Sequence, residues 1–586
     1  MKKIINTPET MVREMCSGLV LAHPSLAFNS KYKVITKKQL NPDKVTLISG
    51  GGSGHEPAHA GFVGKGMLDA AVCGDIFASP SQIQVYQAIR STAGQKGTLL
   101  IIKNYSGDMM NFKNAAFLAG EDGIEVDYVK VDDDIAVEDS LYTVGKRGVA
   151  GTVLVHKIAG AAAERGMSLR EVKEAAQKAI DHTRSIGFAF TSCTVPAKGT
   201  PTFKLEENEM EYGVGIHGEP GIRREPVVTA DELAGRMVSA LLESLDASGD
   251  KVREVTVLVN GFGGTPLQEL YLLSNSVVRE LDARQITVHN VLAGNFMTSI
   301  DMAGASLSLM KLDDQLKELL ADECHTPALF LQGPFEPVKY TEAVREPEQE
   351  QAVSFTCETD ADYATIAGDK LTLNNLVYGI DKMSEIIIQN EIPFCELDAH
   401  AGDGDFGMSV AKGFKQLKTE WKEITEKHIS DIGSFLDACS LVIMEHCGGA
   451  SGPIWGSGFR AAGKYAGARS ELSMQEFAEM IAAVVKGIQD TGERAFGRGA
   501  VVGDKTLIDA LVPYAESWKN SALQGEDFRT ASGKAAAAAV EGAKQTETIV
   551  ARMGRAGTVG ERSIGYPDAG AYALGVIFTG LSEAMH

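Results

Sequence analysis

The apolar residues of this chain change their spacing once, and this change limits what the chain can fold into. Before residue 333, short runs such as 45–48 and 98–102 are mostly apolar and are bounded by turn residues, which is typical of buried strands. Beyond residue 369, apolar side chains recur every three or four residues, as on one face of a helix. The sequence therefore predicts an α/β part followed by an all-helical part.

A chain of 586 residues is too long for one hydrophobic core, so we expect several domains. In the first part, expected strands alternate with helices at 83–92, 111–119 and 169–186, which favours a parallel sheet. Prolines and a run of glutamates after residue 333 predict a linker. The expected order is two α/β subdomains, the linker and an all-helical domain, at 1–186, 187–333, 334–368 and 369–586.

The charge balance excludes some classes of partner. The formal net charge of −22 disfavours binding to nucleic acids or to anionic membranes. The N-terminus lacks the apolar run of a signal peptide, and no run is long enough to cross a membrane. The eight cysteines form no CxxC pair. We therefore expect a cytoplasmic protein with reduced thiols, in which an anionic substrate needs a local positive group or a metal.

Three aspartates, Asp398, Asp403 and Asp405, stand close together with glycines between them. Carboxylates this close repel each other unless a cation lies among them, and Mg²⁺ prefers oxygen ligands and substrate phosphates. A calcium-binding EF-hand loop would need a glutamate at its twelfth position, where Phe414 or Ser409 stands instead. The spacing therefore favours Mg²⁺ bridging nucleotide phosphates, and the plainer alternative is a solvated acidic turn.

Polar loops that follow expected strands carry further candidates. The glycine-rich run 50–54 could cradle an anion at a helix start, or could form only a tight turn; the chain contains no Walker sequence. His55, directly after it, is a natural proton donor or acceptor. Asp108 shares the next loop with Lys103 and would be a credible general base if it lies near His55. His217 is either a hydrogen-bonded loop residue or a nucleophile.

In the helical part, the conspicuous polar residues lie in the expected loops between helices. The loop 448–452 could cover phosphates or could be only a helix C-cap and turn. Arg555 lies in a Gly-Arg-Ala-Gly loop, and its guanidinium could stabilise phosphoryl charge. A third polar loop has the sequence Gly-Asp-Lys-Thr at 503–506.

Together these stretches resemble the ATP-dependent dihydroxyacetone kinase family. The first 333 residues resemble its substrate-binding part, and residues 369–586 resemble its nucleotide-binding part. The resemblance implies that the helical domain is an eight-helix barrel with metals at one end. Besides the three aspartates, it is carried by SGGGSGHEP at 49–57, the loop 103–108, GIHGEPG at 215–221, GASGP at 449–453, GDKT at 503–506 and GERSIG at 560–565.

The resemblance also implies roles for the matched positions. His217 would bond to the ketone carbon of the substrate as a hemiaminal, His55 would assist, and Asp108 would take the proton of the attacking hydroxyl. The substrate pocket would also be lined by Gly52, Ser53, Gly54 and Lys103. Two Mg²⁺ ions bridging the ATP phosphates would be held by Asp398, Asp403 and Asp405. The nucleotide would be surrounded by Phe406, Gly407, Met408, Ser409, Ala450, Ser451, Gly499, Leu507, Arg555, Asp568, Ala569 and Gly570.

Two positions depart from the family pattern, and both concern the fit of the nucleotide. Phe406 stands where a polar residue is frequent, and Ala569 stands where proline is common. The activity implied is phosphorylation of dihydroxyacetone by ATP, since no phosphocarrier domain is present. The alternatives are a kinase for a short ketose such as erythrulose, an added FAD-splitting cyclase activity, and a ketose-sensing regulator, which would not need the aspartates. The implied assembly is a homodimer, in which a linker of about 35 residues permits domain swapping.

Overall fold

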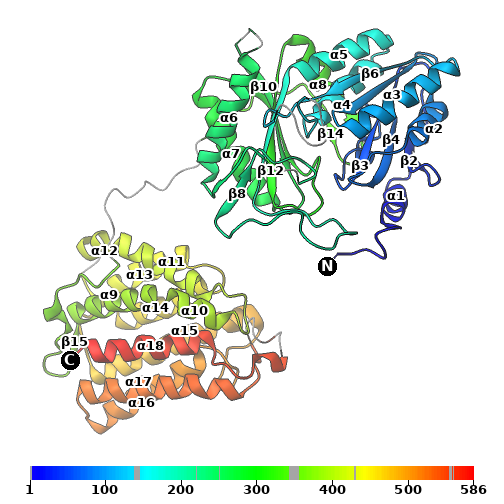
Figure 1. Cartoon of the computed structure of the whole chain (residues 1–586). Helices are drawn as coiled ribbons and strands as arrows, with labels where there is room; N and C mark the ends of the chain where they lie inside the picture. The colour runs from blue at the N-terminus through cyan, green and yellow to red at the C-terminus, as the bar shows by residue number, and fades with distance from the viewer. Residues whose placement is uncertain are drawn as a thin grey trace. The chain divides into compact units, whose positions relative to one another are not determined.

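The computed structural model describes residues 3–137, 145–218, 221–247, 249, 251–341, 355–427, 430–553, 557 and 560–586. The chain divides into two compact units, 1–344 and 345–586, and Figure 1 draws both. The first unit is α/β and the second is helical, so the predicted fold class is confirmed. Among the described helices, none is both long and apolar enough to cross a membrane.

The first sheet of the α/β unit has the strand order β1-β2-β4-β3-β5-β6. Its strands are β1 Leu26–Asn29, β2 Val34–Lys37, β3 Thr46–Ser53, β4 Ala70–Ile76, β5 Thr98–Lys103 and β6 Val126–Val131. The strands β3 to β6 are parallel, as the alternation with helices predicted, and every residue of β3 and β5 is buried. The carboxyl ends of β3 and β5 therefore lie side by side.

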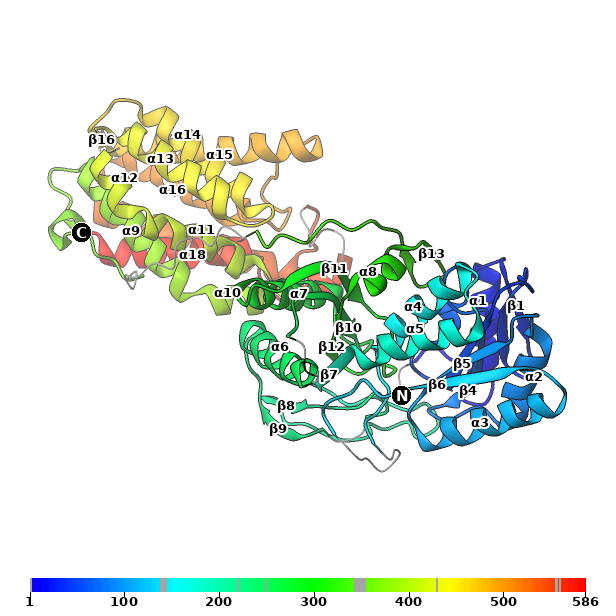
Figure 2. The ribbon, with the colours of Figure 1, turned by 90° about the horizontal axis from the view of Figure 1, so that it is seen from above.

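Helices cover both faces of this sheet. The helices are α1 Met11–Ala22, α2 Gln82–Thr92, α3 Ser106–Glu121, α4 Thr152–Glu164 and α5 Leu169–Asp181. Figure 2 shows α3 on one side of the parallel strands and α4 with α5 on the other. One apolar cluster joins α2 and α3 to the sheet, and a second joins α1, α4 and α5 to its opposite face.

The second sheet has the order β11-β10-β12-β7-β8-β9 and is mixed, because only β10 and β11 run parallel. Its strands are β7 Thr183–Ala189, β8 Glu209–Tyr212, β9 Arg223–Pro226, β10 Glu254–Gly261, β11 Thr287–Gly294 and β12 Gly304–Lys311. The helix expected to reach residue 186 ends at Asp181, because Ile186 and Phe188 pack in the core of this sheet. The expected boundary at 186/187 falls inside β7.

The second sheet is completed by α6 Ala230–Asp246 and α7 Leu267–Ala283, and α8 Asp314–Ala321 packs on α4. A small pair of strands, β13 Cys324–His325 and β14 Phe330–Leu331, follows. Buried Arg147 joins the two sheets, because it pairs with Asp134 and donates to the carbonyl oxygen of Gly213 at 2.8 Å.

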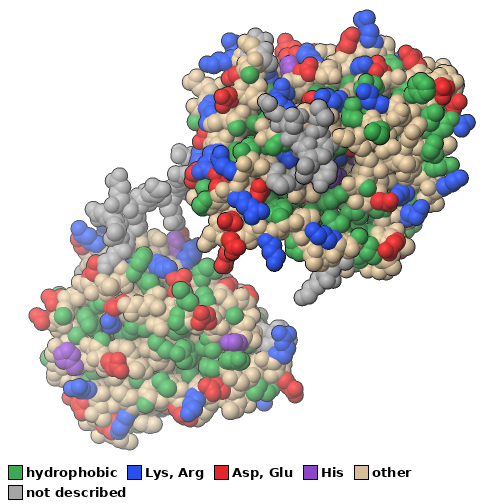
Figure 3. Space-filling view, in the orientation of Figure 1, with side chains coloured by type: hydrophobic (Ala, Val, Ile, Leu, Met, Phe, Trp, Pro, Cys, Tyr) green, Lys and Arg blue, Asp and Glu red, His purple; other side chains and the backbone are tan. Residues whose placement is uncertain are grey.

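Figure 3 shows acidic and basic side chains interspersed over this face of both units.

The helical unit contains a closed ring of eight helices, each of 14 residues or more among the described residues. Each packs against the next, and α18 returns to α9. In ring order they are α9 Leu373–Gln389, α11 Phe406–Thr419, α13 Ile432–His446, α14 Ser451–Ala466, α15 Met474–Phe496, α16 Ile508–Gln524, α17 Phe528–Gln545 and α18 Ala569–Ala584. A capping box formed by Ser473 and Glu476 begins α15. Apolar side chains of the ring line a cavity of about 180 Å³.

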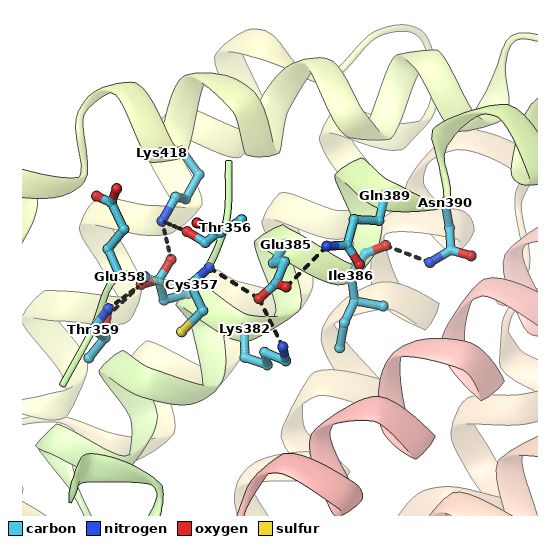
Figure 4. Close-up of polar contacts among 11 residues, drawn as sticks. Thr356, Cys357, Glu358, Thr359, Lys382, Glu385, Ile386, Gln389, Asn390 and Lys418 are labelled. Atoms are coloured by element: carbon cyan, nitrogen blue, oxygen red, sulfur yellow. Dashed lines mark hydrogen bonds and ion pairs between the residues drawn. The ribbon is translucent and has the colours of Figure 1, made fainter. Parts of the chain in front are cut away.

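Shorter elements complete the helical unit: α10 Glu391–Asp398, α12 Trp421–Lys427, and the paired strands β15 Lys370–Thr372 and β16 Glu471–Ser473. Residues 356–359, here called the strap, lie on α9 and α11, within the stretch predicted as a linker (Figure 4). The buried carboxylate of Asp381 accepts hydrogen bonds from the backbone of Glu358 and Thr359, and pairs with Lys418. This end of the predicted linker is therefore held by the helical unit.

Candidate functional site

Three of the predicted residues meet at the carboxyl ends of β3 and β5. His55 follows β3 directly, Lys103 is the last residue of β5, and Asp108 lies in the first turn of α3. All three side chains are buried, with exposures of 0%, 0% and 4%. In parallel sheets, ligands bind at this edge, so the fold gathers these groups at the edge where ligands are expected.

The glycines of β3 permit a close approach of main chains. A Cβ on Gly50 would lie 2.4 Å from the carbonyl oxygen of Val72, and one on Gly52 would lie 2.7 Å from the nitrogen of Ala78. No long helix begins after this run, as one alternative required; the only helical turn there is the 3₁₀ turn Ala60–Phe62, because the chain must return to β4 at residue 70. Close packing therefore explains these glycines, and a helix-start anion cradle does not.

Ser53 and Gly54 each donate a hydrogen bond within this part of the fold. The hydroxyl of Ser53 donates to the carbonyl oxygen of Gly74 at 2.8 Å, which directs it toward β4. The N–H of Gly54 donates to the carboxylate of Glu56 at 2.9 Å. Gly54 has φ +108°, a conformation that a residue with a Cβ rarely adopts. These residues shape the turn that presents His55.

The hydrogen bonds of His55 fix its tautomer. Its Nδ1 lies 2.8 Å from the carbonyl oxygen of Thr298, and a carbonyl oxygen only accepts, so Nδ1 carries the proton. Burial, the charge of Lys103 and the neighbouring His217 lower the pKa of His55 well below its usual value, so the ring is neutral. Its Nε2 therefore offers a lone pair, and this atom lies 3.1 Å from Nε2 of His217.

His217 is brought to this point by the loop between β8 and β9. Three aromatic rings meet it edge to face: His55 at 4.6 Å, Phe77 at 5.1 Å and Tyr105 at 4.7 Å between ring centroids. The predicted neighbour residues Glu219 and Pro220 lie outside the described residues. The two sheets thus hold two imidazoles nitrogen to nitrogen, although they stand 162 positions apart.

Asp108 and Lys103 form the charged side of this cluster. A Cβ placed on Gly51 would lie 3.2 Å from Nζ of Lys103 and 3.5 Å from Oδ2 of Asp108, so both groups border the same point. Ser79 donates to the other oxygen of Asp108. Burial raises the pKa of Asp108, and Lys103, Ser79 and His217 oppose this shift. A carboxylate with a raised pKa is suited to accept a proton.

The three aspartates converge in the helical unit. One carboxylate oxygen of each of Asp398, Asp403 and Asp405 lies within 4.8 Å of the others. Main-chain N–H groups of Gly404 and Phe406 donate to Asp398 at 3.0 and 3.4 Å, which orients its carboxylate. Burial raises the pKa of Asp398, and Asp403 and Asp405 raise it further against these hydrogen bonds. Hard oxygen donors that repel one another fit a divalent cation such as Mg²⁺.

Most positions expected around the nucleotide lie where ring helices begin. Phe406 and Ser451 are the first residues of α11 and α14, Leu507 precedes α16, and Ala569 is the first residue of α18. The starts of α11, α14 and α18 also contain the expected positions Gly407, Met408, Ser409, Ala450, Asp568 and Gly570. The main-chain N–H groups of a helix start, and the positive end of its dipole, favour anions such as phosphates.

Contacts between these helix starts show that they share one rim of the ring. The N–H of Gly448 donates to the carbonyl oxygen of Ser409 at 3.1 Å, which joins α14 to α11. A Cβ on Gly570 would lie 3.1 Å from the Cβ of Leu507, which places α18 beside α16. The rings of His400 and Tyr566 stack at 3.7 Å, which joins the aspartate loop to the segment before α18.

The remaining nucleotide positions are Gly499 and Arg555. Gly499 lies between α15 and α16, where Gln489 donates to the next carbonyl oxygen, that of Ala500, at 2.9 Å. Arg555 lies outside the described residues. Asp568 caps α18 by accepting the N–H of Ala571 at 2.8 Å, and burial raises its pKa to about 7.

Several residues of these sites were not predicted. Thr298 fixes the tautomer of His55 through its main-chain carbonyl oxygen, an atom that every residue carries, so this role left no signal in the sequence. Phe77 and Ser79 follow β4 and had no motif of their own. Lys505 lies in the GDKT loop, which the sequence does reveal, but the loop sequence alone indicates no role for the lysine.

Comparison with known proteins agrees with both parts of the chain. Residues 17–328 match the Dak1 domain and residues 400–583 match the DAK2 domain. An L-erythrulose 1-kinase of Mycolicibacterium smegmatis and a triokinase/FMN cyclase of Rattus norvegicus are each 34% identical, over 100% of this chain and 99% of theirs. The crystal structure of the C. freundii dihydroxyacetone kinase with AMP-PNP and Mg²⁺ has a TM-score of 0.61 and 30% identity, over 99% of both chains.

Proposed function

This chain belongs to the dihydroxyacetone kinase family, and we propose that it uses Mg²⁺ and ATP to phosphorylate a terminal hydroxyl of dihydroxyacetone. The observation that carries the proposal is the pair of imidazoles, His55 and His217, with Nε2 atoms 3.1 Å apart beside Lys103 and Asp108. A simple polyol kinase would need hydrogen-bonding groups for hydroxyls, but not a nucleophile for a carbonyl.

The tautomer of His55 supports a covalent step at His217. Because Nε2 of His55 carries a lone pair, the N–H in the bond between the rings belongs to Nε2 of His217. As Nε2 of His217 bonds to the carbonyl carbon of the ketose, its proton passes to Nε2 of His55 and then to the carbonyl oxygen. The product is a hemiaminal, in which the substrate keeps all its atoms and the carbonyl becomes a hydroxyl.

A ketose held in this way presents its terminal hydroxyl for phosphoryl transfer. The hydroxyl oxygen attacks the γ-phosphorus of ATP, the bond to ADP breaks, and Asp108 takes the hydroxyl proton. The buried position of Asp108 raises its pKa, which suits a general base. Lys103, whose Nζ borders the same point, holds positive charge next to the carboxylate.

The nucleotide belongs to the helical unit in this proposal. Two Mg²⁺ ions would be held by Asp398, Asp403 and Asp405, and when bound they would neutralise charge on the ATP phosphates. The starts of α11, α14, α16 and α18 would orient the phosphates through main-chain N–H groups. The proposal includes a homodimer. A mixture of His217→Ala and Asp405→Asn chains tests whether the ketose site and the nucleotide site come from different chains, because only then does activity recover on mixing.

The second candidate is a kinase for a four-carbon ketose, because the relative from Mycolicibacterium smegmatis is named for L-erythrulose. Steady-state rates with dihydroxyacetone and with each erythrulose enantiomer, at saturating Mg·ATP, separate the two. The FAD-splitting cyclase activity is tested with FAD in place of the ketose. Ketose binding without any ADP release would instead identify a sensor.

The central experiment is a coupled assay of ADP release on wild type and His217→Ala, with ketose and glycerol as substrates. His325→Ala serves as the matched control, since His325 is exposed and lies in β13, outside the pocket. We expect wild type and the control to prefer ketose, and His217→Ala to lose turnover and preference together. Unchanged turnover and preference in His217→Ala would overturn the covalent step.

A further inference from the structure

Lys505, the lysine of the GDKT loop, points its ammonium group into the protein. Its exposure is 2%, and Nζ is surrounded by four main-chain carbonyl oxygens. These belong to Thr546 at 2.7 Å, Ser563 at 2.5 Å, Tyr566 at 2.8 Å and Ile549 at 3.3 Å. An ammonium has only three N–H groups, so these carbonyls use its whole donor capacity. Lys505 therefore has no donor left for a phosphate oxygen.

The four carbonyls come from both ends of the segment that joins α17 to α18. Thr546 and Ile549 follow α17, whereas Ser563 and Tyr566 lie just before α18. Lys505 itself belongs to the loop between α15 and α16. One ammonium group thus ties together two loops that carry expected nucleotide positions, those before α16 and before α18.

The main chain around Lys505 is built to aim it inward. Lys505 has φ +62°, which is unfavourable for a residue with a side chain and needs support from its surroundings. Asp509 supplies part of this support by accepting the N–H groups of Gly503 at 2.6 Å and Thr506 at 2.8 Å. On the other side, Asp504 accepts the N–H of Val501 at 3.0 Å. The turn is therefore held by hydrogen bonds that do not involve the ammonium group.

The carbonyl cage is linked to the aspartate cluster by one contact and to the cap of α18 by another. Tyr566, which offers one of the four carbonyls, stacks its ring on His400 at 3.7 Å with 6° between the planes. His400 lies in the loop between Asp398 and Asp403. A second contact runs through Thr546, whose hydroxyl oxygen accepts the N–H of Asp568, the cap of α18, at 2.8 Å.

We propose that Lys505 is a positioning residue of the nucleotide site, which orders the loops before α16 and α18 through its carbonyl cage and does not bind phosphate. The inference rests on the proposed kinase function, because it assigns these loops to the nucleotide. Without the ammonium, four carbonyl oxygens, two of them in buried hydrogen bonds, lose their donor, and the two ends of the segment lose their common anchor. Binding of the nucleotide then has to order these loops as well, and this entropy cost weakens the binding.

The test compares Lys505→Met with Lys418→Met in the full-length chain. Lys418 is also a buried lysine of the helical unit, but it pairs with Asp381 near the end of α11, about 18 Å along that helix from Phe406. The binding of AMP-PNP with Mg²⁺ is measured by calorimetry, the binding of dihydroxyacetone serves as internal control, and Tm is recorded for each variant.

We expect both variants to have a lower Tm, but only Lys505→Met to weaken AMP-PNP binding, by about tenfold or more. Dihydroxyacetone binding stays within about twofold in both. If Lys505→Met does not fold, Lys505→Arg is judged by the same criterion, since its planar group cannot meet all four carbonyls. Unchanged AMP-PNP binding in a folded variant overturns the inference, whereas a wild type that binds no AMP-PNP overturns the proposed function.

Discussion

The ion pair between Asp381 and Lys418 allows a stability prediction that can be worked from the structure. Both side chains are buried, with exposures of 0% and 1%. One oxygen of Asp381 accepts from the N–H groups of Glu358 and Thr359, at 2.9 Å each, and from the Thr359 hydroxyl at 2.7 Å. The other oxygen faces Lys418, whose ammonium also donates to the carbonyl oxygen of Thr356 at 2.9 Å. The perturbations are Asp381→Asn, Lys418→Met and the double variant.

The expected costs differ because the groups left behind differ. In Asp381→Asn the Lys418 ammonium stays buried beside a neutral amide and one carbonyl, and leaving a buried charge without its partner costs about 3–5 kcal/mol. In Lys418→Met the Asp381 carboxylate keeps three hydrogen bonds from the strap, so we expect a smaller cost of about 2–3 kcal/mol. The double variant should cost less than the sum, by about 2 kcal/mol, because neither charge is then left alone.

Calorimetric unfolding measures these costs in the full-length chain, with the transition of the α/β unit as internal reference. A unit of this size changes its Tm by about 2–4 °C for each kcal/mol, so Asp381→Asn should lower the transition of the helical unit by about 6–20 °C. The transition of the α/β unit should not move. A cost below about 1 kcal/mol for Asp381→Asn, or costs that simply add in the double variant, would show that this pair does not hold the strap.

Two further predictions concern carboxylates of the helical unit. Asp405→Asn should weaken Mg²⁺-dependent AMP-PNP binding about tenfold or more in calorimetry. Without metal it should raise the free energy of unfolding by about 1 kcal/mol, because carboxylate oxygens within 4.8 Å of one another repel. Equal Mg²⁺ dependence in both proteins would contradict this. Burial raises the pKa of Asp568 from 3.8 to about 7, so the folded state binds the proton more tightly and stability falls as pH rises through this range. As pH rises from 5 to 8, the free energy of unfolding measured with urea should fall by about 3 kcal/mol in wild type, a loss that Asp568→Asn lacks. An identical pH profile for the variant would refute this prediction.

The apolar spacing was sufficient to predict several strands of the first part and the helical character of the second part, because it reflects burial directly. The run 98–102 became β5, and the three- and four-residue spacing after 369 became the ring of helices. The spacing could not predict that the second sheet is mixed, since strand direction depends on how distant segments pair. It also could not separate the end of α5 from β7, because Ala179, Ile180 and Ile186 are all apolar and all buried.

The site residues also divide into those that the sequence could predict and those that it could not. The aspartates were predictable, because three carboxylates within eight positions can be read from the sequence. The contacts of His55 with Thr298 and of Lys505 with its four carbonyls were not, because they use main-chain oxygens that every residue carries. Spacing suggests which side chains are chemically able to act. Only the fold decides which nitrogen of His55 holds the proton and which way an ammonium points.

The ring of helices also explains the two departures from the family pattern. Neighbouring helices of such a ring run in opposite directions, so every second helix begins at the same rim, and α11, α14, α16 and α18 are the alternate members. Phe406 and Ala569 are the first residues of α11 and α18, directly after the caps Asp405 and Asp568. What a first helical residue offers a phosphate is its main-chain N–H, which phenylalanine and alanine carry equally but proline lacks. The N–H of Phe406 already donates to Asp398 at 3.4 Å, whereas Ala569 carries an N–H where the family often has none.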